Sequence, residues 1–503
     1  MKNPENGDSL ARYGLLILSI ALATFMASLD GTIVNIALPT ISAAFDISSS
    51  TVSWVSTAYL LVMAGCVLIF GKISDVIGFK KIFLSGFIIF TLGSFSCGFL
   101  PEIIDSFYVL VGSRIIQGVG GAMISAIGPA MITSFIPPMN LKGKAMGIIM
   151  TIAALGTALG PTIGGFLTQY MSWHWIFFIN VPVGIIAVIL GAKVIPPATT
   201  ARGNLSNFDK SGAALIFVGL ASLLFVVSEG DALGWTSPMI AGSLVLAVAS
   251  LGYFVWHELK SADPPILELS LFKNRNFLLT NLVLSLVFFS YSGINYLLPF
   301  YLEYVQGFDT SSAGLILTSL SFAMMIAGIL AGGAIFNKTG GKILCIVAAV
   351  ALATGYFLMT KLGVDTTLGF VVACLLTIGF GLGLMVTPPI SNMIMNSVSR
   401  NHQGMVSSLT SLERFAPMTI GIALFNLVFV QGMTTIAAHR GVTQDAPPIN
   451  IKMSVLSSGF DLAFFVAFIF GIIILILTFI VRQEIHPDFA NDAEKEEPIT
   501  GLI

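Results

Sequence analysis

Residues 13–38 read YGLLILSIALATFMASLDGTIVNIAL, and Asp30 is the only charged side chain in this run. An α-helix of about 20 predominantly apolar residues crosses the hydrocarbon core of a bilayer, so the run predicts a membrane-spanning helix. It is longer than the apolar core of a cleavable signal peptide, and Asp30 stands where such a core would be apolar. We therefore expect this segment to be retained as the first span.

Thirteen further apolar runs of similar length follow along the 503 residues. The chain is 56% apolar and only 10% charged, whereas soluble proteins carry about 25% charged residues. This composition excludes a water-soluble enzyme and predicts an all-α membrane protein with fourteen transmembrane helices. All four cysteines (Cys66, Cys97, Cys345 and Cys374) fall inside apolar runs, which gives no support to a disulfide framework.

The basic residues are distributed unequally between the two sides of the predicted membrane. Of the 23 Lys and Arg residues, eighteen fall on the side of the termini and the even-numbered connections, and only Lys361, Arg440 and Lys452 fall on the other. The positive-inside bias then places both termini in the cytoplasm. A net charge of −2 without a large basic cluster argues against a nucleic-acid partner.

An internal repeat divides the chain into two halves. The pattern Gly71-x3-Asp75-x2-Gly78 recurs as Gly333-x3-Asn337-x2-Gly340, and a similar offset takes Gly160 to Gly421. Repeated halves build the central site of many transporters. We expect an N-terminal six-helix bundle (1–195), a linker with two additional, peripherally packed transmembrane helices (196–275), a C-terminal six-helix bundle (276–482) and an acidic cytoplasmic tail (483–503).

Four ionisable residues, Asp30, Arg114, Glu413 and Arg414, lie inside predicted spans. Each costs roughly 2.5–3.5 kcal/mol on insertion scales, so such residues usually face a cavity. The repeat places Tyr291 opposite Asp30, which suggests that these charges serve function rather than shared architecture. Because burial disfavours a charged carboxylate, Asp30 and Glu413 are predicted proton carriers. The alternative is that each is hydrogen-bonded in the helix packing or permanently paired with an arginine.

The two intramembrane arginines allow different interpretations. Arg114 could keep a neighbouring acid ionised until a proton or a cation arrives, or it could be a fixed counter-ion that holds the bundle together. Arg414 follows Glu413 directly and therefore points about 100° away around the helix, so a simple pair between them is not expected. Arg414 could instead snorkel or pack against backbone carbonyls.

Residues 29–39, LDGTIVNIALP, together with the motifs that follow, resemble the major facilitator superfamily and its fourteen-helix drug:proton antiporter branch. Residues 71–81, GKISDVIGFKK, resemble the cytoplasmic loop motif between the second and third helices. The resemblance implies a gating loop with Gly71, Asp75, Gly78 and Lys80. Family members usually have Arg where Val76 and Phe79 stand here.

Two further motifs carry the resemblance. Residues 113–118, SRIIQG, resemble the fourth-helix motif of this superfamily. The arginine of that motif is associated with proton coupling, so the resemblance implies a role in proton coupling for Arg114. The fifth helix contains the residues of a motif taken as a mark of antiporters: Gly156, Gly160, Pro161, Gly164 and Gly165. Small residues at this spacing let two helices touch, and a proline bends the helix.

Residues 173–182, WHWIFFINVP, also resemble this branch, but His174 stands where Arg is usual. A histidine at the outer surface could sense pH, because its ordinary pKa lies near 6.5. An aromatic cluster at the membrane interface is the alternative interpretation.

The resemblance implies alternating access by two rocking bundles. We expect a proton-coupled efflux antiporter for lipophilic, preferentially cationic, drug-like compounds, in which a proton entering from outside neutralises Asp30 or Glu413. A proton-coupled carrier of lipids or metabolites is the alternative. The predicted substrate contacts, for each of which helix packing is the alternative, are Tyr59, Gln117, Phe288, Tyr291, Asn295 and Asn392.

Other classes of protein receive little support from the sequence. The chain has no H-E-x-x-H, G-x-S-x-G or P-loop pattern, so we expect no enzyme, no catalytic residue, no metal and no cofactor. The expected partners are a small-molecule substrate, protons and membrane lipids, without nucleic acid, and the expected state is a monomer in the cell membrane with multiple spans. A non-transporting receptor would predict that Asp30→Asn leaves activity unchanged.

Overall fold

The fold is all-helical throughout the residues that the computed structural model describes, which are 13–136, 139–196, 209–260, 267–332, 334–386, 388–399, 403–439 and 449–484. The first half of the chain forms α1 (Gly14–Ala44), α2 (Ser49–Val52), α3 (Trp54–Ile77), α4 (Phe79–Ile104), α5 (Phe107–Phe135), α6 (Met139–Tyr170), α7 (Trp175–Phe178) and α8 (Asn180–Val194). Two helices follow, α9 (Lys210–Leu233) and α10 (Pro238–Lys260).

The second half begins after a short 3₁₀ segment, η3 (Leu269–Lys273). It contains α11 (Arg275–Phe300), the π-helical turn η4 (Tyr301–Val305), α12 (Thr310–Gly332), α13 (Ala334–Met359), α14 (Leu368–Val386), α15 (Pro388–Asn396), α16 (Gln403–His439) and α17 (Ile449–Ile480). Within the described residues, thirteen helical stretches are long and apolar enough to cross a membrane. The 32-residue α6 adds a further long helix, and the predicted all-α fold of fourteen long helices is confirmed.

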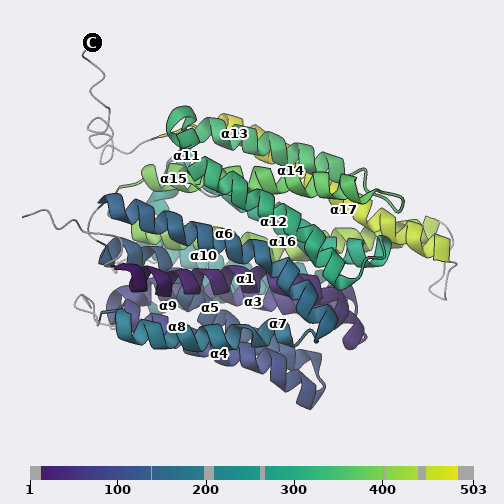
Figure 1. The fold of residues 1–503 in the computed structure, drawn as a ribbon, viewed down its shortest axis with the longest axis horizontal. Coiled ribbons are helices and arrows are strands. Elements are labelled where there is room, and N and C mark those ends of the chain that lie inside the picture. Colours follow the sequence, from purple (N-terminus) through teal and green to yellow (C-terminus); the bar gives the residue numbers. More distant parts are fainter. Residues whose placement is uncertain are drawn as a thin grey trace, which may run out of the picture.

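The long helices run side by side, with the two halves of the chain on opposite sides (Figure 1). Helices α1, α3, α4, α5 and α8 lie on one side, α13, α14 and α17 lie on the other, and α6 and α12 pack against each other between them.

Glycines that the repeat aligns make equivalent contacts in the two halves. A Cβ added to Gly160 in α6 would lie 2.0 Å from Thr32 Oγ1 in α1. A Cβ added to Gly421 in α16 would lie 2.2 Å from the carbonyl oxygen of Phe289 in α11. Both contacts exist because glycine lets two helix backbones approach closely.

The connection between α3 and α4 is shorter than the sequence predicts. The apolar runs end the second span at Gly71 and begin the third at Ile82, but α3 continues to Ile77 and α4 begins at Phe79. Only Gly78 lies between them, with φ of 89°, a conformation that glycine adopts without steric cost. The predicted gating loop is therefore the last turns of α3 and a one-residue turn, because these helices continue past their apolar stretches.

The first extra helix is more deeply integrated than the predicted peripheral role requires. Helix α9 packs against both α3 and α16, which belong to different halves, and α10 packs on α9. The apolar run of the first extra helix ends at Val227 in the sequence, but α9 continues to Leu233. Glu229 therefore lies within α9, where it accepts a hydrogen bond from Trp54 Nε1 in α3. Most of the predicted acidic tail, residues 485–503, lies outside the described residues.

Candidate functional site

Asp30 lies at the centre of a buried polar cluster. One carboxylate oxygen, Oδ2, accepts a hydrogen bond from Arg114 Nη1 of α5 at 2.9 Å. The other, Oδ1, accepts from Gln117 Nε2 at 2.9 Å and from Asn180 Nδ2 of α8 at 3.0 Å. All three donors are N–H groups, so both carboxylate oxygens of Asp30 act as acceptors in this cluster.

Arg114, Gln117 and Asn180 make further hydrogen bonds within the cluster. Arg114 Nε donates to the carbonyl oxygen of Val55 in α3 at 2.9 Å, and Arg114 Nη1 also donates to Gln117 Oε1. Ser94 Oγ of α4 accepts from Gln117 at 2.6 Å and from Asn180 at 3.2 Å. The exposed fraction of Asp30 is 0% and that of Arg114 is 1%. Such a buried pair is tolerable only because further hydrogen bonds satisfy both partners.

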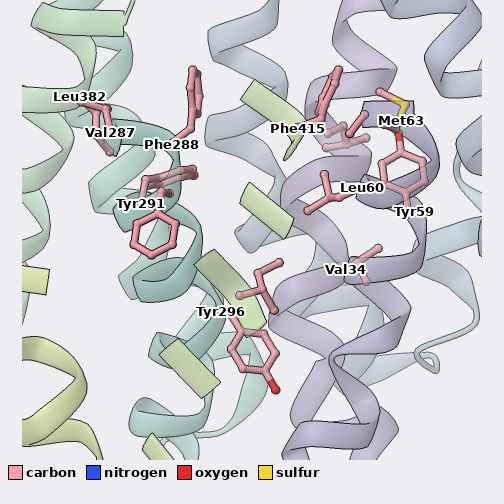
Figure 2. Close-up of a cluster of buried hydrophobic side chains, with 14 of the residues drawn as sticks. Val34, Tyr59, Leu60, Met63, Val287, Phe288, Tyr291, Tyr296, Leu382 and Phe415 are labelled. Atoms are coloured by element: carbon pink, nitrogen blue, oxygen red, sulfur yellow. The ribbon is translucent and has the colours of Figure 1, made fainter. Parts of the chain in front are cut away.

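A cavity of about 290 Å³ lies between the two halves of the chain. Its wall is mostly apolar and aromatic, and Figure 2 shows Tyr59 and Leu60 on one side and Phe288 and Tyr291 on the other. Hydroxyl groups supply most of the polar lining: Thr24, Ser28, Thr32, Tyr59, Ser125, Thr157, Tyr291, Ser391, Thr410 and Ser411. Among the described lining residues, only Arg414 carries a charge at neutral pH.

Tyr59 connects the polar cluster to the cavity. Asp30 does not line the cavity, although its neighbours Ser28 and Gly31 in α1 do. The ring of Tyr59 lines the cavity, and Arg114 Cζ lies 4.1 Å from the centre of that ring, within the range of a cation–π contact. The Asp30–Arg114 pair is thus separated from the cavity by one aromatic ring.

Glu413 and Arg414 occupy different environments in α16. Arg414 is exposed to the cavity, whereas Glu413 is partly buried and does not line it. Glu413 Oε2 is a buried atom that has no hydrogen-bond partner among the described residues. The expected divergence of these two side chains is therefore present.

The six predicted substrate contacts separate into two groups. Tyr59, Phe288 and Tyr291 line the cavity. Gln117, Asn295 and Asn392 are not among its lining residues, and Gln117 belongs to the Asp30 cluster instead. Their placement is a correction to the predicted lining, because a helix that is apolar on most sides does not reveal which face meets the cavity. The contact of any of the six with a substrate stays a prediction.

The glycine motif of α6 faces two partners. Gly156, Gly160 and Gly164 lie against α1 within the first half of the chain. Gly165 lies against the start of α12, where an added Cβ would be 2.6 Å from the carbonyl oxygen of Thr310.

Pro161 and Thr162 also contact α12, in the second half of the chain. A Cβ added to Gly314 would be 2.2 Å from the carbonyl oxygen of Pro161. Beside it, Thr162 Oγ1 and Thr318 Oγ1 are 2.5 Å apart. The motif therefore joins a contact within one half to a contact between the halves.

The predicted gating residues lie in the last turns of α3, the one-residue turn after it and the first turn of α4. A Cβ added to Gly71 would be 2.6 Å from Ser408 Oγ of α16, which places Gly71 at a contact between the halves. Lys80 Nζ donates to the carbonyl oxygen of Ala192 at the end of α8, at 2.7 Å. The side chain of Asp75 is outside the described part of the structure. A gating role for these residues stays a prediction.

His174 belongs to an aromatic cluster just before α7. Its ring stacks on Trp173 with centroids 3.6 Å apart, and its Nδ1 lies 2.9 Å from Ser172 Oγ. Partial burial lowers the pKa of His174, and the nearby carboxylate of Glu102 opposes this shift. The aromatic interpretation therefore describes its contacts, while a pH-sensing role stays a prediction.

Sequence reasoning missed Ser94 and Asn180 as partners of Asp30, although Asn180 lies within a quoted motif. Each is a lone polar side chain within or at the edge of an apolar run, the same weak signal that many packing residues give. In the part of the chain that the structure describes, no group of three or more His, Cys, Asp or Glu residues is placed to hold a metal.

Comparison with known proteins identifies the family of the chain. A sequence profile of the Major Facilitator Superfamily matches residues 20–422. The chain belongs to the Major Facilitator Superfamily. The D-xylose-proton symporter has the same fold in a crystal structure, with a TM-score of 0.63, 14% identity, and coverage of 94% of this chain and 98% of the symporter.

Similar curated proteins are bacterial transporters. The riboflavin transporter RibZ of Clostridioides difficile (strain 630) is 34% identical, over 84% of this chain and 89% of the relative. The multidrug transporter protein MdtP of Bacillus subtilis (strain 168) is 33% identical, over 85% of this chain and 77% of the relative. The multidrug resistance protein Stp of Mycobacterium tuberculosis is 32% identical, over 88% of this chain and 80% of the relative. This superfamily member is thus a multi-pass membrane transporter and not an enzyme.

Proposed function

We propose that this superfamily member is a proton-coupled antiporter of the cell membrane that exports lipophilic, drug-like compounds by alternating access. One observation carries the proposal: a cavity between the two halves is separated only by Tyr59 from the buried Asp30–Arg114 pair. Apolar and aromatic walls suit lipophilic compounds. The names of MdtP and Stp support a drug-exporting role.

The hydrogen bonds of Asp30 support the proposed proton coupling. A proton on this carboxyl would turn one of its acceptor sites into a donor and remove the charge that balances Arg114, so the contact between Asp30 and Arg114 would weaken. Because Arg114 packs on Tyr59, its movement would alter the cavity wall. Binding of a proton and of cargo would then be linked through Arg114 and Tyr59.

Glu413 is the second candidate for carrying a proton. Its buried Oε2 has no partner among the residues that the structure describes. Burying an unpaired charged carboxylate is costly, so such a group is stable when it carries a proton or meets a cation. Its neighbour Arg414 lines the cavity, so a proton bound at Glu413 would lie one residue from the proposed cargo site.

Alternating access requires contacts between the halves that can open in turn. Thr162 meets Thr318 at one end of the bundle, and Gly71 approaches Ser408 at the other. The positive-inside bias assigns the end with Gly71 and Gly78 to the cytoplasm, together with both termini. In this proposal the two six-helix bundles of a monomer are the moving units.

The described wall of the cavity does not match the charge of the cargo that the sequence predicts. The sequence suggests cationic compounds, but Arg414 is the only charged side chain in the described wall of the cavity, and it does not favour a cation. A metabolite carrier is the second candidate, and the name of the relative RibZ supports it.

The test is transport by the purified protein in vesicles with an imposed pH gradient. We expect uptake of lipophilic dyes into vesicles with an acidic interior, and collapse of that uptake when an ionophore abolishes the gradient. Vesicles without protein are the control. Gradient-driven movement of riboflavin in place of the dyes would favour the metabolite carrier, and a lack of both would contradict the proposal.

A further inference from the structure

Arg414 stands among aromatic rings in the wall of the cavity. Its Cζ lies 5.5 Å from the ring centre of Phe288 and 5.8 Å from that of Phe415. Both rings line the cavity, as do those of Tyr59 and Tyr291. A guanidinium that packs over rings keeps its N–H edge available for other partners.

No described carboxylate neutralises Arg414. In the part of the chain that the structure describes, Arg414 forms no ion pair, and no acidic residue lines the cavity. Asp30 is occupied by Arg114, Gln117 and Asn180. Glu413 precedes Arg414 but does not line the cavity. The positive charge of Arg414 is therefore available to interact with a molecule bound in the cavity.

The chemistry of the wall favours one class of occupant. The planar fork of an arginine matches a carboxylate or sulfonate with two parallel hydrogen bonds. The surrounding rings accept a flat aromatic body, and a volume of about 290 Å³ suits a small ring system. A cation of the same shape would meet the charge of Arg414 without a compensating carboxylate.

We propose that Arg414 makes this cavity select aromatic organic anions over cations of the same size. This inference rests on the proposed function only in taking the cavity as the cargo site. Selection requires binding alone, and it does not depend on the coupling of binding to a proton gradient.

The experiment measures equilibrium binding of two charged naphthalenes to the purified full chain in a non-ionic detergent. Naphthalene-2-sulfonate and 2-naphthyltrimethylammonium share a ring system and carry fixed charges of opposite sign. We expect the wild type to bind the sulfonate at least tenfold more tightly. Arg414→Gln should abolish this preference and Arg414→Lys should largely retain it. Ser19→Ala, which removes a buried hydroxyl of α1 that does not line the cavity, should leave the ratio unchanged.

Equal affinities, or a preference for the ammonium compound in the wild type, would overturn the inference. An unchanged ratio in Arg414→Gln would also overturn it. If that variant does not purify as a folded protein, the wild-type ratio and its retention in Arg414→Lys decide. Sulfonate selectivity without gradient-driven transport would contradict the proposed antiporter and leave this inference standing.

Discussion

The guanidinium of Arg114 lies 2.9 Å from a carboxylate oxygen of Asp30, and neither side chain exposes more than 2% of its surface. The two residues come from α5 and α1, so the pair crosslinks two helices of the first half. Removing one partner of a buried pair leaves an uncompensated charge, which costs about 3–5 kcal/mol. Removing either Asp30 or Arg114 should therefore lower the stability of the protein as well as affect any proton transfer by Asp30.

Replacing Asp30 tests this coupling directly. Asp30→Asn keeps the shape of the side chain but removes the charge that balances Arg114. We expect gradient-driven transport to fall at least tenfold and to lose its pH dependence. We also expect the free energy of unfolding to fall by about 3–5 kcal/mol, because Arg114 is left buried and unpaired. Vesicle transport between pH 5.5 and 8.5 and denaturant unfolding provide the measurements.

Two further variants separate the structural effect from the functional one. Asp30→Asn combined with Arg114→Gln should recover part of the lost stability, since no buried charge remains, but should not recover transport. Ser19→Ala in the same helix removes a buried hydroxyl that donates to the carbonyl oxygen of Leu15 and serves as the control. Unchanged transport with an unchanged pH profile in Asp30→Asn would contradict the coupling and remove Asp30 from the proposed mechanism.

Glu413→Gln should behave differently from Asp30→Asn. Glu413 Oε2 has no hydrogen-bond partner in the described structure, so the neutral amide should change the free energy of unfolding by less than about 1 kcal/mol. If Glu413 carries the transported proton, the variant should still move cargo down its own gradient but lose the response to pH. A pH profile that matches the wild type would remove Glu413 from the mechanism.

The sequence predicts the charged residues of the candidate site better than it predicts their partners. Asp30 and Arg114 stand out because ionisable residues are rare in apolar spans. Their pairing depends on how α1 packs on α5, which an apolar pattern does not specify. Ser94 and Asn180 complete the cluster, yet each resembles any small polar residue in helix packing. The sequence therefore reveals the buried charges but not the hydrogen-bond network around them.

The sequence likewise predicts the number of helices better than it predicts where they end. Fourteen long apolar runs predict fourteen helices, since each must satisfy its backbone hydrogen bonds within the membrane. The predicted ends of the second and third spans are wrong. Residues 72–77 continue α3 beyond its apolar run, and residues 79–81 begin α4 before its own apolar run. The cavity lining was predictable only in part, because faces of mostly apolar helices resemble each other.

Gly160 should be intolerant of even a methyl group. A Cβ at this position would lie 2.0 Å from Thr32 Oγ1, whereas a Cβ at Gly112 would meet nothing within 4 Å. We expect Gly160→Ala to lower the melting temperature by several degrees because α1 and α6 must separate. Gly112→Ala should leave it unchanged or raise it, since alanine favours a helix by about 1 kcal/mol. Equal melting temperatures for the two variants would contradict the close contact.

His174 should make the protein less stable in acid. Partial burial lowers its pKa in the folded state, while the unfolded state keeps a pKa of about 6.5. The unfolded state then binds more protons, so the destabilisation grows as pH falls through about 6.5 and is absent well above it. Between pH 7.5 and 5.5, the melting temperature of His174→Gln should therefore fall by less than that of the wild type. Ser172→Ala retains the titrating ring as a control, and parallel losses in His174→Gln and wild type would exclude this role.

The contact between Thr162 and Thr318 should be breakable during transport. Their Oγ1 atoms are 2.5 Å apart and join α6 to α12 across the two halves. Cysteines at both positions would place sulfur atoms near the length of a disulfide, about 2.05 Å. We expect oxidation of Thr162→Cys/Thr318→Cys to reduce transport at least tenfold and a reductant to restore it. Each single variant should remain active under oxidant, which also controls for the four native cysteines. Full transport by the crosslinked protein would show that this contact stays closed throughout the cycle and would contradict rocking about the cavity.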